Sequence, residues 1–444
     1  MKRIIYLAVL SITTLCYSCN NNDDDIVTTD VNVKLVYPQE NGAEPKEGVT
    51  VKFTDANGST FEQTTNSSGV STFKVPYGLY EASASDKRSA EGYAYIYNGT
   101  KSNIDINSSW TINDTVTLEL METEAGQIII KELYVGGCPK DDGSGSFSFD
   151  KYAILYNNSD QSATLDNLCL GMVLPYNATS TNADYIGDKL YYEAEGWIPA
   201  GNGFWYFQNA VTLEPGEQIV VNCIGAIDNT QTYSQSINFA NSEYYCCYDI
   251  EDYYNTSFYP APASVIPTSN YLMAYKYGAG NTWPLSVSSP AFYIFRTKDS
   301  TPATFGTDES NLNYHKGTVS PINARKKVPT DWILDGIEVF AAGKDNNVKR
   351  LTANIDAGQI SMTYKLGYSL YRNVDKEATE AISKNAGKLV YNYNMGTEVD
   401  GTMSTDLSGI DAEASIKNGA RIVYMDTNNS SKDFHQREKA SLRN

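Results

Sequence analysis

The sequence contains only two histidines, His315 and His435, in 444 residues. Zinc and haem sites rely on imidazole ligands, so we predict no metal site and no cofactor. The common catalytic patterns are also missing, because the chain has no G-x-S-x-G, no H-E-x-x-H and no phosphate-binding loop. We therefore expect no enzymatic activity and assign no catalytic residue. Paired carboxylates of a glycoside hydrolase leave no spacing signature, so a hydrolase remains a third alternative.

Basic residues are scarce. The chain has 34 lysines and arginines against 53 aspartates and glutamates, which gives a formal net charge of −19. Nucleic-acid binding depends on basic patches that neutralise phosphates, and the sequence has none. We therefore expect no nucleic-acid partner. The acidity is compatible with solubility, cations or positively charged partners.

Long apolar runs are absent after the first 18 residues. Ile4 to Leu15 is an apolar run of about 12 residues, too short for a membrane-spanning helix but typical of a signal peptide. It follows the basic pair Lys2 and Arg3, whose removal would change the net charge from −19 to −21. We predict a signal peptide over residues 1–18.

Cys19 is the predicted lipidation site, because it follows the small residue Ser18, as lipoprotein processing requires. Cys16 is the alternative, but it follows the bulky Leu15. Two or three acyl chains would anchor the protein stably in a bilayer. Residues 19–29 then form a lipidated acidic linker. A cysteine followed by an acidic run (Asp23 to Asp25) resembles the lipoprotein export signal of Bacteroidota. The resemblance implies a lipid anchor in the outer membrane, with the protein exposed on the extracellular face.

Five cysteines remain after Cys16 and Cys19 are assigned. An exported compartment permits disulfides, but an odd number leaves at least one cysteine unpaired or paired with another chain. A direct bond between adjacent cysteines needs unusual backbone geometry, so separate partners are favoured for the vicinal pair. The candidate disulfide cysteines are Cys138, Cys169, Cys223, Cys246 and Cys247.

Tyrosine is abundant, at 34 residues against 14 phenylalanines, and apolar residues alternate along much of the chain. This composition predicts an all-β protein. Turn signals at Asp55–Gly58 and Asn66–Gly69 separate short alternating runs in residues 30–122, which predicts a β-sandwich. The predicted strands cover residues 31–37, 48–53, 60–65, 70–75, 79–85 and 115–121.

Three motifs give residues 30–122 a more specific resemblance. They are the GVTV strand at Gly48–Val51, the T-x-x-x-G-x-x-x-F pair at Thr65–Phe73 and the corner at Pro76–Tyr80. Together they resemble the carboxypeptidase-regulatory-like, or collagen-adhesin-B-type, prealbumin fold. The resemblance implies a prealbumin-like β-sandwich that serves as a rigid stalk or spacer.

Residues 126–444 resemble a lamin-tail-like immunoglobulin sandwich with long insertions. The matching strands are expected at residues 126–135, 151–156, 164–170, 213–221, 332–339 and 367–372, and the closing motif at 426–444. We expect a large insertion at about residues 176–330 and a helix over residues 375–388. The whole layout resembles an uncharacterised family of Bacteroidota surface lipoproteins. Such proteins are often encoded beside TonB-dependent outer-membrane receptors, which implies a receptor of this kind as a partner.

One segment of the expected insertion, Glu243–Tyr259, combines six tyrosines with four acids and two cysteines. The rings either pack as a small core of their own or form an aromatic platform for sugars, cationic groups or ferric iron. The tentative binding residues are Tyr244, Tyr245, Tyr248, Tyr253, Tyr254 and Tyr259. A second aromatic run, Trp197–Phe207, is expected to be a buried strand.

The sequence favours a non-enzymatic lipoprotein of the outer membrane, exposed at the cell surface, that captures a nutrient or partners a TonB-dependent transporter. The alternative is an adhesin or structural surface protein that binds glycans or proteins of a host or neighbouring cell. The sequence identifies no ligand.

Overall fold

The computed structural model describes residues 27–38, 43–90, 93–111, 114–125 and 127–443. The predicted signal peptide, the lipidation site Cys19 and most of the acidic linker lie outside these residues. No helix in the described part of the chain is both long and apolar enough to cross a membrane.

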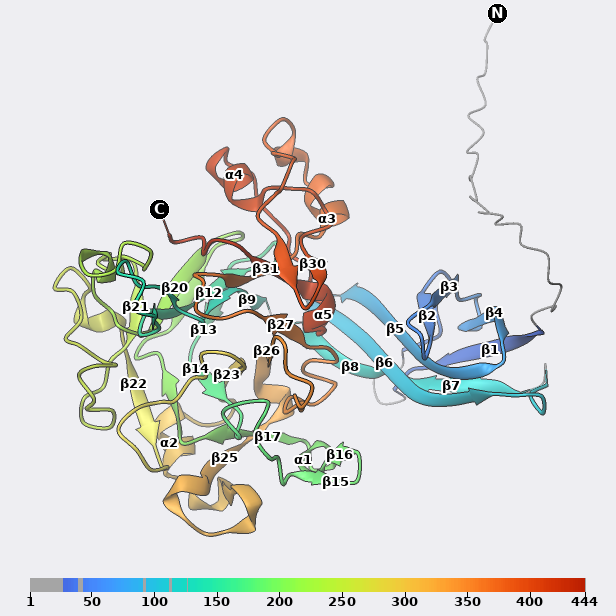
Figure 1. The fold of residues 1–444 in the computed structure, drawn as a ribbon, viewed down its shortest axis with the longest axis horizontal. Helices are drawn as coiled ribbons and strands as arrows, with labels where there is room; N and C mark the ends of the chain where they lie inside the picture. Colours follow the sequence, from blue (N-terminus) through green and yellow to red (C-terminus); the bar gives the residue numbers. More distant parts are fainter. Residues whose placement is uncertain (1–26, 39–42, 91–92, 112–113, 126, 444) are drawn as a thin grey trace, which may run out of the picture.

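The described residues between 28 and 125 form two facing β-sheets (Figure 1). In the smaller sheet, β1 (Thr28–Val36) lies between β4 (Val70–Pro76), to which it is antiparallel, and β7 (Thr115–Glu119), to which it is parallel. The larger sheet has the order β3 (Thr60–Thr64), β2 (Thr50–Asp55), β5 (Gly78–Ala90), β6 (Tyr93–Ile106) and β8 (Met121–Ala125).

Alternation of side chains produces the core between these sheets. Val31, Val33 and Leu35 of β1 are buried, and they pack in one cluster with Phe53 and Tyr80 of the other sheet. All six strands predicted from the alternation of apolar residues form within a few residues of the expected bounds. The predicted turns also form, with positive φ at Gly58 and Gly69.

Strand β6 was not predicted, because its middle reads Asn98-Gly99-Thr100-Lys101-Ser102-Asn103, a typical turn sequence. It nevertheless runs beside both β5 and β8. Gly99 makes this approach feasible, since a Cβ atom there would lie 2.5 Å from the carbonyl oxygen of Glu119.

The remaining chain is organised around one long sheet of twelve strands (Figure 1). Its order is β27 (Ile360–Met362), β26 (Ile333–Ala341), β23 (Ala291–Arg296), β14 (Leu168–Met172), β18 (Gly203–Tyr206), β22 (Tyr271–Lys276), β21 (Tyr245–Cys247), β20 (Gln218–Ile224), β12 (Lys151–Asn157), β9 (Ile128–Tyr134), β28 (Ser369–Arg372) and β31 (Phe434–Arg437).

The long sheet folds onto itself. Leu133 of β9 and Leu155 of β12 share one hydrophobic cluster with Leu170, Phe292 and Ile337 from the other half of the sheet. The side chain of Asp335, on β26, also accepts a 2.6 Å hydrogen bond from the Ile130 amide of β9. The two halves therefore pack face to face, and the predicted all-β sandwich class is confirmed.

Residues 176–330 are part of this sandwich. The prediction that they form a large insertion is therefore wrong. They supply β18, β20, β21, β22 and β23, five strands of the twelve-stranded sheet. Long irregular loops separate these short strands and hid their continuity in the sequence. The aromatic run Trp197–Phe207 forms β17 (Trp197–Gly201) and β18, and it is buried almost throughout, as expected.

Smaller sheets and short helices surround the sandwich. The small sheets are β10 (Cys138–Pro139) with β11 (Ser146–Phe147), β13 (Ala163–Leu165) with β19 (Val211–Leu213), β15 (Tyr185–Ile186) with β16 (Lys189–Leu190), β17 with β25 (Ala324–Pro329) and β24 (Leu312–Tyr314), and β29 (Thr397–Val399) with β30 (Thr402–Ser404). The α-helices are α1 (Tyr191–Ala194), α2 (Pro302–Thr307), α3 (Lys376–Glu380), α4 (Ala412–Lys417) and α5 (Ser430–Asp433).

Helix α3 confirms the start of the helix predicted over residues 375–388 but not its length. Asp375 caps it by accepting a 3.0 Å hydrogen bond from the Ala378 amide. The α-helix ends at Glu380, and only a 3-10 turn at Ser383–Asn385 follows.

Candidate functional site

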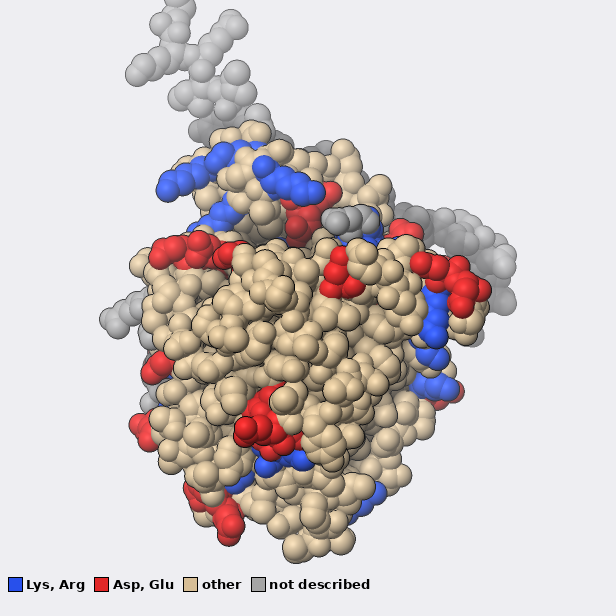
Figure 2. Space-filling view, turned by 90° about the vertical axis from the view of Figure 1, so that its left-hand side faces the viewer, with Lys and Arg blue, Asp and Glu red and all other residues tan. Residues whose placement is uncertain are grey.

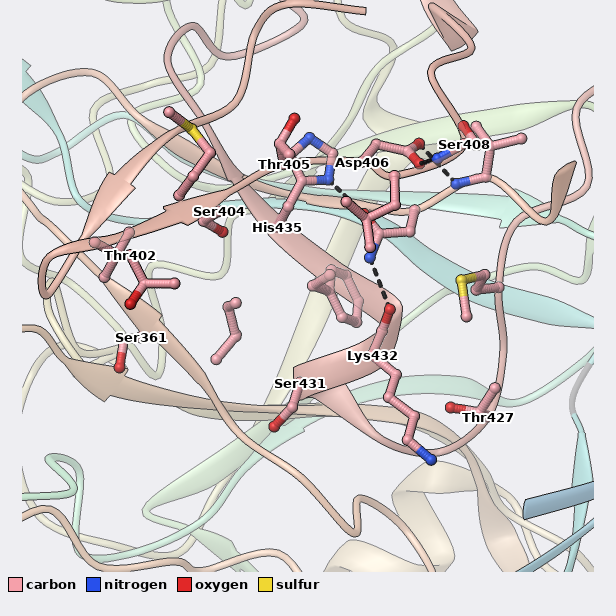
Figure 3. A pocket seen from close by; sticks show the side chains of 18 of the residues that line it. Ser361, Thr402, Ser404, Thr405, Asp406, Ser408, Thr427, Ser431, Lys432 and His435 are labelled. Carbon is pink, nitrogen blue, oxygen red and sulfur yellow. Dashed lines mark hydrogen bonds between the residues drawn. The ribbon is translucent and has the colours of Figure 1, made fainter. Parts of the chain in front are cut away.

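A cleft of about 1010 Å³ lies on the side of the sandwich where the two parts of the chain meet (Figure 3). Its walls come from β27, the connection between β28 and α3, the β29–β30 hairpin, α5 and β31. One residue, Lys52 of β2, comes from the N-terminal sandwich. That sandwich contacts the larger one nearby, since the Asn98 side chain donates a hydrogen bond to the Thr427 carbonyl.

The lining combines an apolar base with many hydroxyl groups. Val374, Val399 and Phe434 are buried residues of the lining. The hydroxyl-bearing residues are Ser361, Thr402, Ser404, Thr405, Ser408, Thr427 and Ser431. Figure 3 shows them spread around the cleft rather than gathered at one point.

Three of these hydroxyls are available to a ligand. Ser361, Thr402 and Thr405 make no side-chain hydrogen bond to any residue that the structure describes. Others are already used inside the protein. The Ser431 hydroxyl, for example, donates to the Gln359 carbonyl at 2.7 Å, and that of Thr427 donates to Asp433 at 2.7 Å.

His435 lies at the back of the cleft as a neutral imidazole. Asn373 fixes the tautomer: its amide nitrogen donates to the Lys432 carbonyl at 2.7 Å, which leaves its oxygen to accept from Nδ1 of His435, also at 2.7 Å. Nε2 then accepts from the Tyr393 hydroxyl. Burial, with Arg437 nearby, lowers the pKa of His435 to about 3. Both ring nitrogens are therefore occupied.

The carboxylates in the lining are also held by the protein. Asp375 caps α3, Asp400 accepts from the Gly343 amide at 2.7 Å, and Asp426 lies 3.3 Å from Arg372. Asp406 accepts from the amides of Val374 and Ser408 at 2.9 and 2.8 Å, and burial raises its pKa (Figure 3). In the described ranges, no group of three or more His, Cys, Asp or Glu residues could hold a metal ion.

Three lysines line the cleft, and they differ in their surroundings. Lys52 forms an ion pair with Glu62, and both side chains are about half exposed, at 44% and 52%. Lys376 lies 6.0 Å from the ring centre of Tyr391. Lys432, on α5, extends from the base of the cleft (Figure 3). Burial and the neighbouring charge of Lys52 lower the pKa of Lys432.

A buried charge cluster supports the wall behind α5. The guanidinium of Arg372 binds Asp335, and it lies 3.3 Å from Asp426 and 3.7 Å from Asp433. The cluster thus joins β26, β28, α5 and the loop before α5. It fixes the positions of Thr427, Lys432 and Phe434, which face the cleft.

The six tentative binding tyrosines do not form one exposed face. Tyr253 and Tyr259 are buried and pack on Trp205, with ring centres 5.2 and 5.7 Å away. The Tyr259 hydroxyl accepts a hydrogen bond from the Trp283 amide at 3.1 Å. These two rings belong to the main core because β21 runs through the middle of the sheet.

The other four tyrosines of this set are at least partly accessible. Tyr244, Tyr245 and Tyr248 are partly buried against three different hydrophobic clusters. Tyr254 is 60% exposed. Figure 2 shows that the end of the molecule carrying β20–β22 is largely free of charged side chains, with only scattered acids and lysines or arginines.

The five candidate disulfide cysteines are all buried, free thiols: Cys138, Cys169, Cys223, Cys246 and Cys247. None of the open pairings is formed among these five described residues. Cys223 and Cys247 lie on the adjacent strands β20 and β21, and their thiols are in contact. Burial and contact with Cys223 raise the pKa of Cys247.

The other histidine, His315, is buried far from the cleft, where Nδ1 lies 3.2 Å from Asp184. Asp184 also receives a bidentate contact from Arg325, at 2.6 and 2.8 Å. This arrangement is a structural ion pair with every polar atom of the carboxylate occupied. The sequence assigned His315 no function. It also did not identify the residues that line the cleft, because isolated serines and threonines form no recognisable motif.

A protein-family profile described as "Protein of unknown function (DUF4876)" matches residues 214–441, just over half of the chain. Every residue that lines the cleft, except Lys52, lies within this match. Comparison with curated proteins gives no match.

Two solved structures are similar to this chain. A crystal structure of a DUF4876 family protein from Bacteroides thetaiotaomicron is 20% identical, with a TM-score of 0.50, over 91% of this chain and 94% of that one. A structure from Bacteroides ovatus, of a protein proposed to be an adhesin, is 14% identical over 45% of this chain and 88% of that one. Its TM-score is 0.20, so only the first similarity bears on the fold. From the extent of the profile match, we conclude that the chain belongs to the DUF4876 family.

Proposed function

We propose that this protein is a lipoprotein of the outer-membrane surface that captures a small, hydroxyl-rich nutrient in the cleft and passes it to a TonB-dependent transporter. Cys19 would carry the lipid, and the N-terminal sandwich, with its prealbumin-like motifs, would serve as the spacer. The larger sandwich, which supplies almost all of the cleft lining, would be the binding head.

The observation that carries this proposal is the lining of the cleft. Its volume of about 1010 Å³ is at the upper end of small-molecule sites. Its base is apolar, and Ser361, Thr402 and Thr405 offer unused hydroxyls. A sugar presents both complementary surfaces, since its C–H face is apolar and its hydroxyls both donate and accept hydrogen bonds.

Binding rather than catalysis suits the polar groups of this cleft. Both nitrogens of His435 and the oxygens of Asp406 are engaged by the protein. A general acid or base needs a free atom within hydrogen-bond reach of the substrate. These groups hold the walls together, so we propose a non-enzymatic role.

The test is calorimetric titration of the protein with a panel of neutral and acidic sugars, together with a variant that fills the cleft. Thr402→Trp, on the exposed face of β30, should abolish binding because the indole would occupy the cleft. Glu398→Trp is the matched control: it adds the same ring to the same hairpin, but Glu398 does not line the cleft. Binding that survives Thr402→Trp would overturn the proposed site.

Adhesion is the second candidate function, and one observation favours it. The largely uncharged end of the molecule in Figure 2 contrasts with a chain of net charge −19. The segment between β21 and β22 exposes Ile250, Tyr254 and Val265. Proteins that contact other macromolecules often present such apolar side chains. Capture of a glycan or matrix protein by both wild type and Thr402→Trp would support adhesion over nutrient capture.

A further inference from the structure

Lys432 is a half-buried ammonium that forms no direct ion pair within the described part of the chain. Among the described residues, none accepts a hydrogen bond from its Nζ atom or lies within ion-pair distance. Burial and the charge of Lys52 lower the pKa of Lys432, and the more distant charges of Asp433 and Glu62 raise it. Burying an unpaired charge is unfavourable, and the energetic cost falls when an anion approaches.

The neighbouring carboxylates make their direct contacts with other groups and not with this ammonium. Asp433 is buried, and its oxygens accept from the amide and hydroxyl of Thr427. Glu62 pairs with Lys52 instead. The lining acids Asp375 and Asp406 are bound to backbone amides. The negative groups around the cleft are thus committed, whereas the positive group at its base is not.

The lysine pair also lies in an unusual place for this chain. The protein is strongly acidic overall, so a local excess of positive charge is not part of a general basic surface. Lys52 and Lys432 come from different sandwiches but line the same cleft, and the charge of Lys52 acts on Lys432. An anion bound between the two ammonium groups would be attracted by both at once.

Building on the function proposed above, we infer that the cleft selects a sugar acid, whose carboxylate lies between Lys432 and Lys52 and whose hydroxyls face Ser361, Thr402 and Thr405. The apolar base beside Phe434 would then support the C–H face of the ring. Uronic acids are the simplest ligands with this combination of one carboxylate and several neighbouring hydroxyls. Lys432 would contribute most of the recognition, because it forms no ion pair with a described residue that a ligand would have to break, whereas Lys52 is paired with Glu62.

The experiment compares each acid with its own methyl ester. Glucuronate, galacturonate and mannuronate, together with the three methyl esters, are titrated calorimetrically into the full-length mature protein. Esterification removes the charge and keeps every hydroxyl, so the ratio of the two affinities measures recognition of the carboxylate. Inorganic phosphate is titrated separately to find out whether a bare anion binds as well.

We expect at least one acid to bind at least about tenfold more tightly than its ester, because a hydrogen bond to a charged group is worth about 1.5–3 kcal/mol. Lys432→Gln should remove this preference. Lys52→Gln should reduce it less, since Lys52 already forms an ion pair with Glu62. Lys74→Gln, an exposed lysine of β4, removes the same charge away from the cleft and should leave the preference unchanged. If Lys432→Gln has a lower melting temperature than wild type, its loss of preference could reflect unfolding. Lys52→Gln then provides the second test of carboxylate recognition.

The outcomes separate this inference from the proposed function. Equal binding of acids and esters, unaffected by Lys432→Gln but abolished by Thr402→Trp, would overturn the inference and leave a neutral-sugar site. Phosphate that binds as tightly as the acids would show an anion site without sugar selectivity and would also overturn it. Absence of binding by the acids, the esters and the neutral sugars would refute both proposals.

Discussion

At the scale of single residues, Arg372 is the side chain on which the cleft wall most depends. It compensates the buried carboxylates of Asp335, Asp426 and Asp433. Arg372→Met keeps an unbranched apolar stem but removes the guanidinium that faces these acids. We expect a loss of roughly 3–5 kcal/mol in the free energy of unfolding, measured by urea denaturation.

Arg372→Lys serves as the graded control for this prediction. It restores one positive charge but not the planar fork, which also donates 2.8 and 2.9 Å hydrogen bonds to the carbonyls of Ile130 and Met425. Its stability should lie between those of wild type and Arg372→Met. If Arg372→Met unfolded at the same urea concentration as wild type, the cluster would not support the cleft wall.

His435 gives the wild type a specific response to pH. Burial lowers its pKa to about 3, whereas an unfolded histidine titrates near pH 6.5. Below about pH 6.5 the unfolded state therefore binds more protons than the native state, and the contribution of His435 to stability falls as the pH drops towards 3. Burial raises the pKa of Asp335 to about 7, so Asp335 titrates in the opposite sense.

A comparison with His435→Asn isolates this effect, because Asp335 is common to both proteins. We expect the stability advantage of wild type over His435→Asn to be largest at pH 7 and to shrink steadily between pH 6.5 and pH 4. Urea denaturation at several pH values measures the difference. A gap that is constant over this range would mean that His435 is not held in its neutral form.

At the scale of elements, the β29–β30 hairpin determines one wall of the cleft. Its turn places Asp400 and Gly401 at φ values of 51° and 77°. Residues with a Cβ atom rarely adopt this left-handed backbone conformation. Gly401→Val should strain this turn by roughly 1 kcal/mol or more. We expect faster hydrogen exchange of the amides in Thr397–Ser404 and weaker binding in the cleft.

Glu398→Val is the control, since it introduces the same side chain within β29, where the backbone is extended. Exchange in the hairpin should then stay close to that of wild type. Similar exchange rates in both variants would show that the left-handed turn does not govern the order of this wall.

Strands were predicted correctly where apolar and polar residues alternate along the sequence. Strands were missed where tertiary packing, and not such alternation, determines the structure. Strand β1 alternates regularly because one of its faces is buried and the other exposed, so its periodicity is visible. Strand β6 was hidden by its turn-like residues, and strand β23 is buried on both faces, which removes the alternation.

The cleft was beyond sequence reasoning for the same physical reason. Its lining combines Ser361, Thr402 and His435, which the fold of the larger sandwich brings together, with Lys52 from the N-terminal sandwich. Hydroxyl residues are common, so no spacing marks them as a site. The tyrosine-rich segment was conspicuous in sequence, yet Tyr253 and Tyr259 are core residues.

At the scale of the whole molecule, the described chain begins in the N-terminal sandwich (Figure 1), and that sandwich contributes Lys52 to the cleft. If Cys19 carries the lipid, the N-terminal sandwich separates the anchor from most of the cleft wall. A binding site that serves a transporter embedded in the same membrane depends on this anchor for its high local concentration.

The anchor can be tested with the two cysteines that the sequence leaves as alternatives. Cys19→Ser should abolish incorporation of radiolabelled palmitate and move the protein from the membrane to the soluble fraction, because no acyl chain can attach. Cys16→Ser changes the same kind of residue three positions earlier and should leave labelling and membrane association intact. The opposite result would assign the lipid to Cys16, and labelling of neither residue would remove the lipoprotein basis of the proposed function.

Proteinase added to intact cells then distinguishes the two faces of the membrane: digestion of the wild-type protein without lysis is expected only if it lies on the extracellular face.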